Sequence, residues 1–336
     1  MSIKKTLLLI TALFAAAFVL AACAGPAGSA GLAGPAGPVG PQGETGPIPL
    51  AADLSCTACH NDTTLLTGKE ASWGESLHGT GVVFLEDGGN KSCAGCHSGG
   101  GFTAMIAAGL TPVTVEAGDP NPTRQDCRAC HQIHTTYTID DFALETTAPV
   151  TLFTSGQTFD GGMGNLCANC HQARKAMTAV VDGKVDVTAR FGPHHGPQSD
   201  MLLGIGGAGA VTGTPSMHAT TVENTCVTCH MGGDAANHSF APNVATCVTC
   251  HTDATTFDIN GVQTEVDGKI ATLKTALTTA GLLDAQGAIV AGKYDEAKAN
   301  ALWNYIFVTK EDKSRGVHNS AYTIALLDAS LAVFAP

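Results

Sequence analysis

The sequence predicts a mainly α-helical protein with extensive irregular loops, and three observations support this. A unit of two cysteines and a histidine, CxxCH, occurs six times between residues 56 and 251. Clusters of Gly, Pro, Thr and Asn, such as GDPNPTRQD at 118–126, separate these units. The last 75 residues instead carry apolar residues at three- and four-residue steps, which is the period of helices packed on a core.

Residues 1–22 have the pattern of a secretory signal peptide. Lys4 and Lys5 precede an apolar run from Thr6 to Ala22, and the small residues of LAAC end at Cys23. This ending is similar to the cleavage site of bacterial lipoproteins, so we expect Cys23 to be lipidated. An ordinary signal peptide and a single N-terminal membrane helix are the alternatives, although the run is short for a span. Each alternative predicts export. If Cys23 is lipidated, the lipid would anchor the protein to the outer membrane or cell surface, and an anchor on the periplasmic face of the outer membrane is one of these cases.

Residues 23–49 are predicted to be the lipidated Cys23 followed by a collagen-like Gly-X-Y tether. Glycine occupies every third position from Gly25 to Gly46, with frequent proline, which is a collagen-like composition. A triple helix is the alternative, but eight triplets are few and none has proline in its third position. An extended, polyproline-like segment would reach about 70 Å at roughly 3.1 Å per residue. We expect it to hold the following region clear of a membrane surface.

The charge of the mature chain excludes one class of partner. Removal of residues 1–22 takes away two lysines and no acidic residue, which leaves 15 basic and 29 acidic residues and a net charge of −14. Binding to nucleic acid needs a basic surface, so we expect no nucleic-acid partner.

The six CxxCH units predict covalent haem. They begin at Cys56, Cys93, Cys127, Cys167, Cys226 and Cys247, and we number them motifs 1 to 6. Two thiols on one short turn can add to the two vinyl groups of one haem, and the following histidine then lies beneath the iron. Disulfides or zinc are the alternatives, but neither explains a histidine after the second cysteine in every unit. The predicted cofactor is therefore six haem c groups, attached through Cys56, Cys59, Cys93, Cys96, Cys127, Cys130, Cys167, Cys170, Cys226, Cys229, Cys247 and Cys250.

The haem-binding region extends over residues 50–260, and a helical segment over 261–336 follows it. We expect short helices at the motifs and irregular loops between them, so that haem attachment staples the fold together. Helices are predicted within 267–283, 294–308 and 318–334, whose apolar residues follow helical spacing. The stretch DINGVQTEVDG at 258–268 has an incomplete calcium-loop pattern, and we expect a loop there.

The second axial ligand of each iron separates electron carriers from enzymes, since an open position lets substrate bind. Six histidines follow the motifs as proximal ligands: His60, His97, His131, His171, His230 and His251. Seven more are candidate distal ligands: His78, His134, His194, His195, His218, His238 and His318. His194 and His195 are neighbours whose side chains diverge, so we expect one of them to serve a given iron. Methionine is the rival ligand, and six are available in the mature chain: Met105, Met163, Met177, Met201, Met217 and Met231.

The octapeptide CRACHQIH at 127–134 holds two of these histidines. His131 and His134 are three residues apart and project to similar sides of a helical turn, whereas the two ligands of one iron approach from opposite faces. His134 is therefore predicted to bind a different iron from His131, and the haem of motif 1 is our choice. The octapeptide would then fix the separation of two haems.

The serial CxxCH units, CVTCHM followed by HSF, and DKSRGVHNSAY resemble the multihaem cytochromes c related to ammonia-forming nitrite reductase, octahaem tetrathionate reductase and hydroxylamine oxidoreductase. In that family the last histidine is a distal ligand from the C-terminal helices, which implies this role for His318. Nitrite reductases typically mark the catalytic haem with a motif ending in lysine, and all six motifs here end in histidine, which puts nitrite reduction in doubt. The lipoprotein signal and Gly-Pro tether resemble those of surface multihaem cytochromes of metal-reducing bacteria.

Three functions remain open from the sequence. The first is a non-enzymatic electron carrier with six bis-histidine haems, which exchanges electrons with other cytochromes or an extracellular acceptor in anaerobic or extracellular respiration. The second is a reductase or oxidoreductase of small nitrogen or sulfur compounds with one five-coordinate haem, near which the unpaired member of His194 and His195 would move protons. The third is a subunit of a cytochrome filament, in which a histidine of one subunit ligates a haem of the next.

Overall fold

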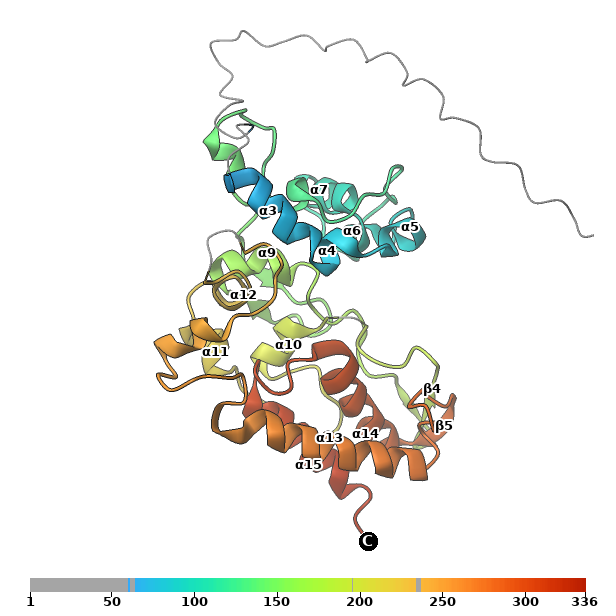
Figure 1. Ribbon diagram of the computed structural model, residues 1–336. Coiled ribbons are helices and arrows are strands. Elements are labelled where there is room, and N and C mark those ends of the chain that lie inside the picture. Colours follow the sequence, from blue (N-terminus) through green and yellow to red (C-terminus); the bar gives the residue numbers. More distant parts are fainter. Residues whose placement is uncertain (1–59, 61–63, 195, 234–236) are drawn as a thin grey trace, which may run out of the picture. The chain divides into compact units, whose positions relative to one another are not determined.

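The computed structural model describes residues 60, 64–194, 196–233 and 237–336 (Figure 1). Contacts divide the chain after Pro49, and every described residue belongs to the unit Leu50–Pro336. Cys23, Cys56, Cys59 and His195, together with the predicted signal peptide and tether, lie outside the described residues. Within the described ranges, no helix combines the length and apolarity needed to cross a membrane.

Helices predominate, and strands are few and short, as the sequence predicts. The α-helices are α3 (Thr64–Gly74), α4 (Leu77–Thr80), α5 (Val83–Asp87), α6 (Ala94–His97), α7 (Gly99–Ala107), α8 (Cys127–Cys130), α9 (Asn165–Ala168), α10 (Gln198–Leu203), α11 (Met217–Thr221), α12 (Thr225–His230), α13 (Val262–Thr279), α14 (Glu296–Ile306) and α15 (Ser320–Ala332). The 3₁₀-helices are η1 (Ile139–Phe142), η2 (Gly162–Gly164), η3 (Val244–Thr249) and η4 (Ile259–Gly261), and η5 (Phe307–Asp312) is a π-helix. The strands are β1 (Val150–Thr151), β2 (Thr158–Phe159), β3 (Val180–Val181), β4 (Lys184–Val187) and β5 (Gly292–Asp295).

Each described motif forms one tight helical turn. The amide of the motif histidine donates to the carbonyl of the first cysteine, four residues earlier, at 2.9 Å in motifs 2, 3 and 4 and 2.7 Å in motif 6. Residues three apart lie on the same side of such a turn, so both cysteine side chains project together. The turn thus places both thiols of a CxxC unit on one side, as attachment to a single haem would require.

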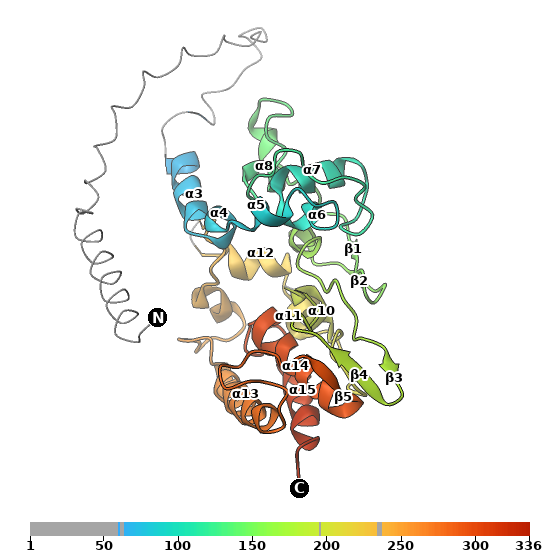
Figure 2. The same cartoon turned by 90° about the vertical axis from the view of Figure 1, so that its right-hand side faces the viewer.

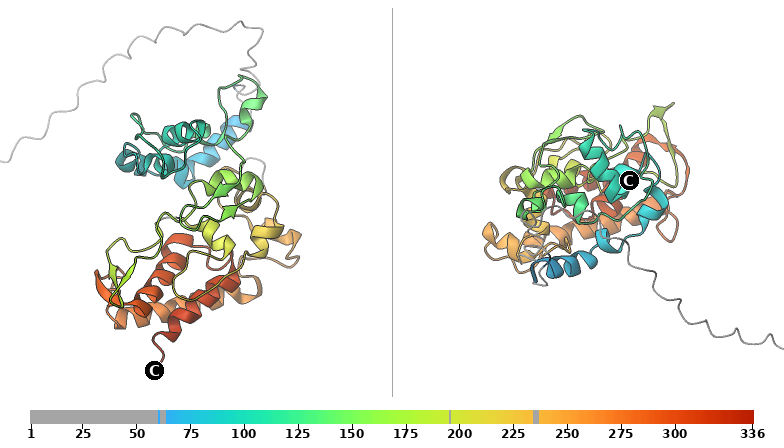
Figure 3. Two further views of the ribbon diagram at one scale, coloured as in Figure 1. Left: turned by 180° about the vertical axis from the view of Figure 1, so that it is seen from behind. Right: turned by 90° about the horizontal axis from the view of Figure 1, so that it is seen from above.

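The C-terminal helices α13, α14 and α15 form the largest core (Figures 1 and 3). They lie where the apolar periods predict helices, and they enclose Leu273, Leu302, Trp303 and Leu326, each at most 2% exposed. The prediction of a loop over 258–268 is wrong from Val262 onward, because α13 begins there. Its polar residues fit the solvent-facing side of an amphipathic helix, which the incomplete calcium pattern obscured.

Two small antiparallel sheets were not predicted. β1 pairs with β2, and the other sheet has the order β3-β4-β5 beside α14 (Figure 2). β3 and β4 are joined by Asp182 and Gly183, at φ values of +49° and +70°. An Asp-Gly pair with positive φ is the favoured two-residue hairpin turn, so VVDGKVDV carried a signal for this hairpin.

Polar contacts fasten the loop after α10 to the C-terminal helices. The side-chain oxygen of Asn304 accepts from the Ala208 amide at 2.7 Å, and its nitrogen donates to the Ala208 carbonyl at 3.2 Å. The Trp303 indole donates to the Gly206 carbonyl at 2.9 Å, and the Tyr322 hydroxyl accepts from the Gly207 amide at 2.9 Å. Since Asn304 is only 2% exposed, these bonds satisfy groups that would otherwise be buried without partners.

Candidate haem-binding sites

Every motif histidine faces a second histidine from elsewhere in the chain. The distances between ring centroids all lie between 6.1 and 6.4 Å. We name the pairs after their motifs: pair 1 is His60–His134 (6.1 Å), pair 2 His97–His194 (6.3 Å), pair 3 His131–His238 (6.4 Å), pair 4 His171–His78 (6.2 Å), pair 5 His230–His318 (6.3 Å) and pair 6 His251–His218 (6.3 Å).

This spacing is too long for stacked rings and matches two imidazoles that share one metal ion. A metal–nitrogen bond is about 2.0–2.1 Å long. In a five-membered ring with bonds of about 1.35 Å, the nitrogen lies about 1.15 Å from the centroid. Two such rings on opposite sides of one metal therefore have centroids about 6.3 Å apart. All six pairs have this centroid spacing to within a few tenths of an ångström.

Two histidines alone are an incomplete ligand set for a protein-bound metal. Among the described residues, no group of three or more His, Cys, Asp or Glu side chains could hold an ion. Tetrahedral and octahedral sites need four to six ligands, so the pairs fit a metal whose remaining ligands come from a planar group between the rings.

Acceptors at Nδ1 orient five of these histidines. Nδ1 of His131 lies 2.7 Å from the Phe142 carbonyl, that of His218 2.6 Å from the Val317 carbonyl, and that of His230 2.8 Å from the Phe240 carbonyl. His171 and His318 contact side chains, Gln198 Oε1 at 2.9 Å and Asp312 Oδ1 at 2.6 Å. A proton on Nδ1 satisfies each acceptor and leaves the Nε2 lone pair for a metal, as in most metal-binding histidines.

The Gln198 side chain shows how one tautomer is fixed. Its amide nitrogen donates to the carbonyls of Glu311 and Asp312 at 3.1 and 3.3 Å. Its oxygen is thereby turned toward His171 and accepts from Nδ1. α10 and the π-helix η5 thus cooperate to orient the histidine of motif 4.

Burial keeps several of these imidazoles neutral. It lowers the pKa of His78 to about 4, with a smaller contribution from His171, and it also lowers the pKa of His171 and of His230. Metal binding requires the neutral imidazole, so histidines that resist protonation are suited to it. For His318 burial also lowers the pKa, but the Asp312 carboxylate and, to a smaller extent, Cys226 together more than offset burial, so the net pKa is raised.

Asp312 is the most deeply buried acceptor in this set, with a side chain that is 0% exposed. Besides His318, it accepts from the Ser314 amide at 3.1 Å and from the Ser314 hydroxyl at 2.5 Å. The sequence analysis assigned no role to Asp312, Gln198 or Phe240. Asp312 and Phe240 do lie in DKSRGVHNSAY and HSF, two of the stretches that carry the family resemblance.

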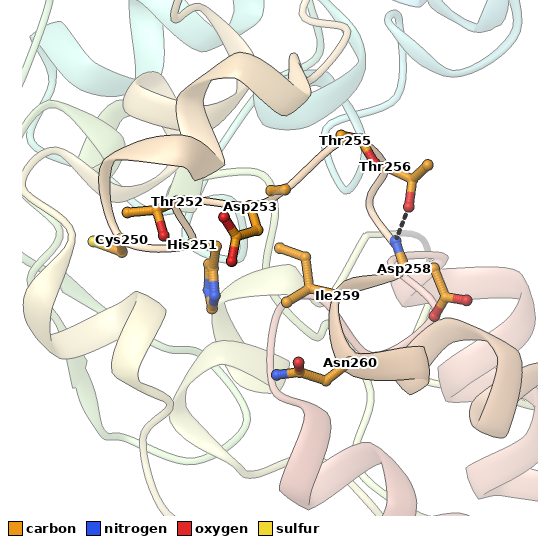
Figure 4. A pocket seen from close by; sticks show the side chains of 10 residues that line it. Cys250, His251, Thr252, Asp253, Thr255, Thr256, Asp258, Ile259 and Asn260 are labelled. Carbon is orange, nitrogen blue, oxygen red and sulfur yellow. Dashed lines mark hydrogen bonds between the residues drawn. The ribbon is translucent and has the colours of Figure 1, made fainter.

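A hollow of about 310 Å³ adjoins motif 6 (Figure 4). Cys250 and His251 line one part of it, and Asp258, Ile259 and Asn260 line another. The hollow therefore lies between the last motif and the start of α13.

The comparisons with known proteins give structural matches only. No family model matches the chain, and no curated protein matches it. Among solved structures, Outer Cell Wall Cytochrome OcwA matches with a TM-score of 0.51 and 22% identity, over 80% of this chain and 50% of that chain. The chain has a multihaem cytochrome fold.

A second match is the undecahaem cytochrome from the S-layer of Carboxydothermus ferrireducens, with a TM-score of 0.41 and 21% identity over 80% of this chain and 40% of that chain. The chain thus spans about half the length of OcwA, the first of these two multihaem cytochromes. The CxxCH units predict a multihaem cytochrome, and the structural match to OcwA confirms this prediction at the level of the fold.

Proposed function

We propose that this protein is an exported hexahaem c-type cytochrome that conducts electrons through six bis-histidine haems. Each motif would attach one haem through its two cysteines, and the two histidines of the corresponding pair would be the axial ligands. When bound, haem iron exchanges single electrons. The chain's own residues orient the ligands, exclude water and hold neighbouring groups in contact.

The observation that carries the proposal is the set of six histidine pairs, one for each motif. Every pair has the centroid spacing of two imidazoles on one iron. An enzyme of this kind needs an iron with an open position, and none of the motif histidines lacks a second histidine opposite it. This favours the electron carrier over the reductase. It also favours a self-contained unit over the filament subunit, because each second histidine comes from the same chain.

The side chains near the pairs fit a flat apolar group with acidic substituents. Leu77, beside His78, is 85% exposed, and Met217, beside His218, is 72% exposed. Porphyrin faces would cover apolar side chains such as these. Nε of Arg174 is buried without a hydrogen bond, and a haem propionate would supply a charge-assisted partner for it.

Two observations support a proposed location and a class of partner: the sequence of residues 1–23 and the name of the similar structure. OcwA is described as an outer cell wall protein. With the predicted signal peptide and lipidated Cys23, we propose that this protein lies at the cell surface. It would exchange electrons with another cytochrome or an extracellular acceptor.

Mass spectrometry and reductive titration of the purified mature protein test this function. The proposal requires six covalent haems and the uptake of six electrons per chain, with no spectral change on adding cyanide and no turnover of nitrite or hydroxylamine. Fewer than six haems would overturn the haem count. A cyanide-induced shift with turnover would favour the reductase instead.

A further inference from the structure

The contacts between motifs follow their order along the chain only in part, because motif 1 is linked to motif 3 and motif 2 to motif 4. Motif 1 is linked to motif 3, because His134 of pair 1 follows His131 of pair 3 by three residues. The octapeptide at 127–134 therefore supplies one histidine to each of two pairs. Motif 2, although it lies between them in sequence, contributes to neither pair.

The Cys96 carbonyl of motif 2 accepts from the Gln125 side chain, two residues before motif 3, at 2.7 Å, but the cysteine contact of motif 2 is with motif 4. The thiol groups of Cys96 and Cys170 are close enough to interact, and the Cys170 thiol donates to the Gly95 carbonyl at 3.7 Å. These sulfurs represent the thioether atoms of the attached haems, so the edges of two haems would meet here. The segment that carries His194 of pair 2 is also bonded to the residues that follow motif 4, since the amides of Arg174 and Lys175 donate to the Pro193 carbonyl at 3.0 and 3.2 Å.

Motif 3 reaches motif 4 through a shared core. Ala129 and Cys130 of motif 3 pack with Leu166 and Cys170 around Phe102. Among the distal histidines, the centroid of the Phe240 ring lies 4.8 Å from that of His78 of pair 4 and 6.3 Å from that of His238 of pair 3. One aromatic side chain thus contacts the distal histidines of both motifs.

The segments that directly precede motifs 4 and 5 are hydrogen-bonded to each other. The Met163 amide donates to the Asn224 side chain at 3.0 Å, and the Thr225 hydroxyl donates to the Gly161 carbonyl at 3.2 Å. The side chains of Cys167 and Cys226 are in contact, which brings two further thioether positions together.

A hydrogen-bonded path joins the histidines of these two motifs as well. It runs from Nδ1 of His171 through Gln198 to the Asp312 carbonyl, and the Asp312 carboxylate accepts from His318 of pair 5.

Motif 6 contacts motif 5. The Asn243 amide, four residues before Cys247, donates to the Cys229 carbonyl at 3.4 Å. His218 of pair 6 bonds to the carbonyl of Val317, the residue before His318 of pair 5. Motif 6 is therefore adjacent to motif 5 twice: near the cysteines of the two motifs, and near their distal histidines His218 and His318.

From these contacts we propose that the protein is a branched conductor with motif 4 as its junction. Routes from motifs 2, 3 and 5 meet at motif 4, motif 3 continues to motif 1, and motif 5 continues to motif 6. Motifs 1, 2 and 6 are then three separate ends at which electrons enter or leave. This rests on the proposed electron-transfer function, and it adds that one donor could supply two acceptors through a single protein.

The branching is tested by delivering electrons at motif 6 and timing their arrival at the other two ends. A ruthenium photosensitiser attached at T255C, an exposed position on the loop after motif 6, injects the electrons (Figure 4). His134→Met or His194→Met marks the haem of motif 1 or motif 2, because a methionine ligand raises its potential and changes its absorption. His238→Ala then perturbs motif 3, and His78→Ala perturbs motif 4, in each marked background.

The branched route predicts that His238→Ala slows arrival at motif 1 at least tenfold and leaves arrival at motif 2 unchanged, whereas His78→Ala slows both. Slowing of both arrivals by His238→Ala would overturn the branch and favour a route in chain order. Arrival at neither end before any perturbation would instead refute the electron-transfer function itself.

Iron positions in the unaltered protein provide a test that does not depend on folding of variants. Anomalous scattering from crystals of the haem-loaded protein locates all six irons. The iron of motif 4 should have those of motifs 2, 3 and 5 as its nearest neighbours, and the iron of motif 1 should be nearest to that of motif 3. A linear order in which the motif 4 iron has two close neighbours would overturn the junction while leaving the proposed function intact.

Discussion

Through His318, Asp312 would give the proposed haem of motif 5 a carboxylate partner that lowers its reduction potential. The buried carboxylate accepts from Nδ1 of His318 at 2.6 Å, and a carboxylate in this position increases the electron donation of the imidazole to the metal. Asp312→Asn removes the negative charge and keeps an oxygen that can accept from His318. The potential of this haem should therefore rise.

The magnitude follows from the distance between the carboxylate and the iron. The 2.6 Å contact, the width of an imidazole and a metal–nitrogen bond of about 2 Å put the carboxylate roughly 6–7 Å from the iron. At an effective dielectric constant of about 20, two unit charges at this distance interact by about 2.5 kcal/mol. Since a tenfold change in a one-electron equilibrium corresponds to about 59 mV, the full effect is about 100 mV, and we expect a rise of roughly 50–100 mV.

Spectroelectrochemical titration of the haem-loaded variant measures this shift. One of six components should move upward by that amount and the other five by less than about 20 mV, because the change is local. Asp328→Asn is the matched control, since it makes the same change in net charge at a carboxylate that is 52% exposed and pairs with Lys269. A uniform shift of all components, or equal shifts in the two variants, would refute a specific role for Asp312.

Three further predictions concern other parts of the chain. His194→Ala should convert one haem to a high-spin state in optical and EPR spectra while His195→Ala should not, because the ring of His194 lies opposite His97; the reverse result would assign the ligand to His195. Burial raises the pKa of Asp200 from 3.8 to about 6, so between these values the folded state retains a proton that the unfolded state releases. The contribution of Asp200 to the free energy of unfolding is therefore greatest below pH ~4 and falls as the pH rises to ~6. Asp200→Asn should therefore abolish a pH-dependent loss of about 3 kcal/mol at most, measured by denaturant unfolding at pH 4 and pH 7, and an unchanged pH dependence would contradict this. Leu273→Ala, at a fully buried position, should reduce the free energy of unfolding by about 2–5 kcal/mol. Val181→Ala, at a position that is 66% exposed, is the control and should change it by less than about 0.5 kcal/mol. Equal losses of free energy in urea titrations of the two variants would contradict the assigned core.

The sequence predicted what depends on local spacing. Two cysteines and a histidine within one turn specify their chemistry wherever the turn lies in space, so the motifs could be recognised without a structure. The same holds for the C-terminal helices, whose apolar periods fix which side is buried. Local geometry also excluded His134 from the iron of His131, and the structure places its ring opposite His60; ligation of that haem stays a prediction.

The remaining pairings depend on contacts between distant segments and could not be read from spacing. His78 meets His171 only because α3 and α4 are held against the lead-in to motif 3, where the Trp73 indole donates to the Gln125 carbonyl at 2.9 Å. His238 is brought to His131 in part by a bond from its amide to the Ser72 hydroxyl at 2.9 Å. Such contacts carry no periodic signature, which is also why the junction at motif 4 is invisible in the order of the motifs.

EPR spectroscopy of the fully oxidised protein tests the central claim most directly. The angle between the two imidazole planes on a ferric haem determines the shape of its low-spin signal, with parallel planes giving a rhombic signal and perpendicular planes a highly anisotropic one. Pairs 1, 3 and 5 have interplanar angles of 34°, 31° and 42°, and pairs 2, 4 and 6 have angles of 81°, 68° and 74°. Six low-spin haems per chain, about equally divided between the two signal types, are the predicted result. A high-spin ferric signal that accounts for one haem or more would contradict six bis-histidine centres.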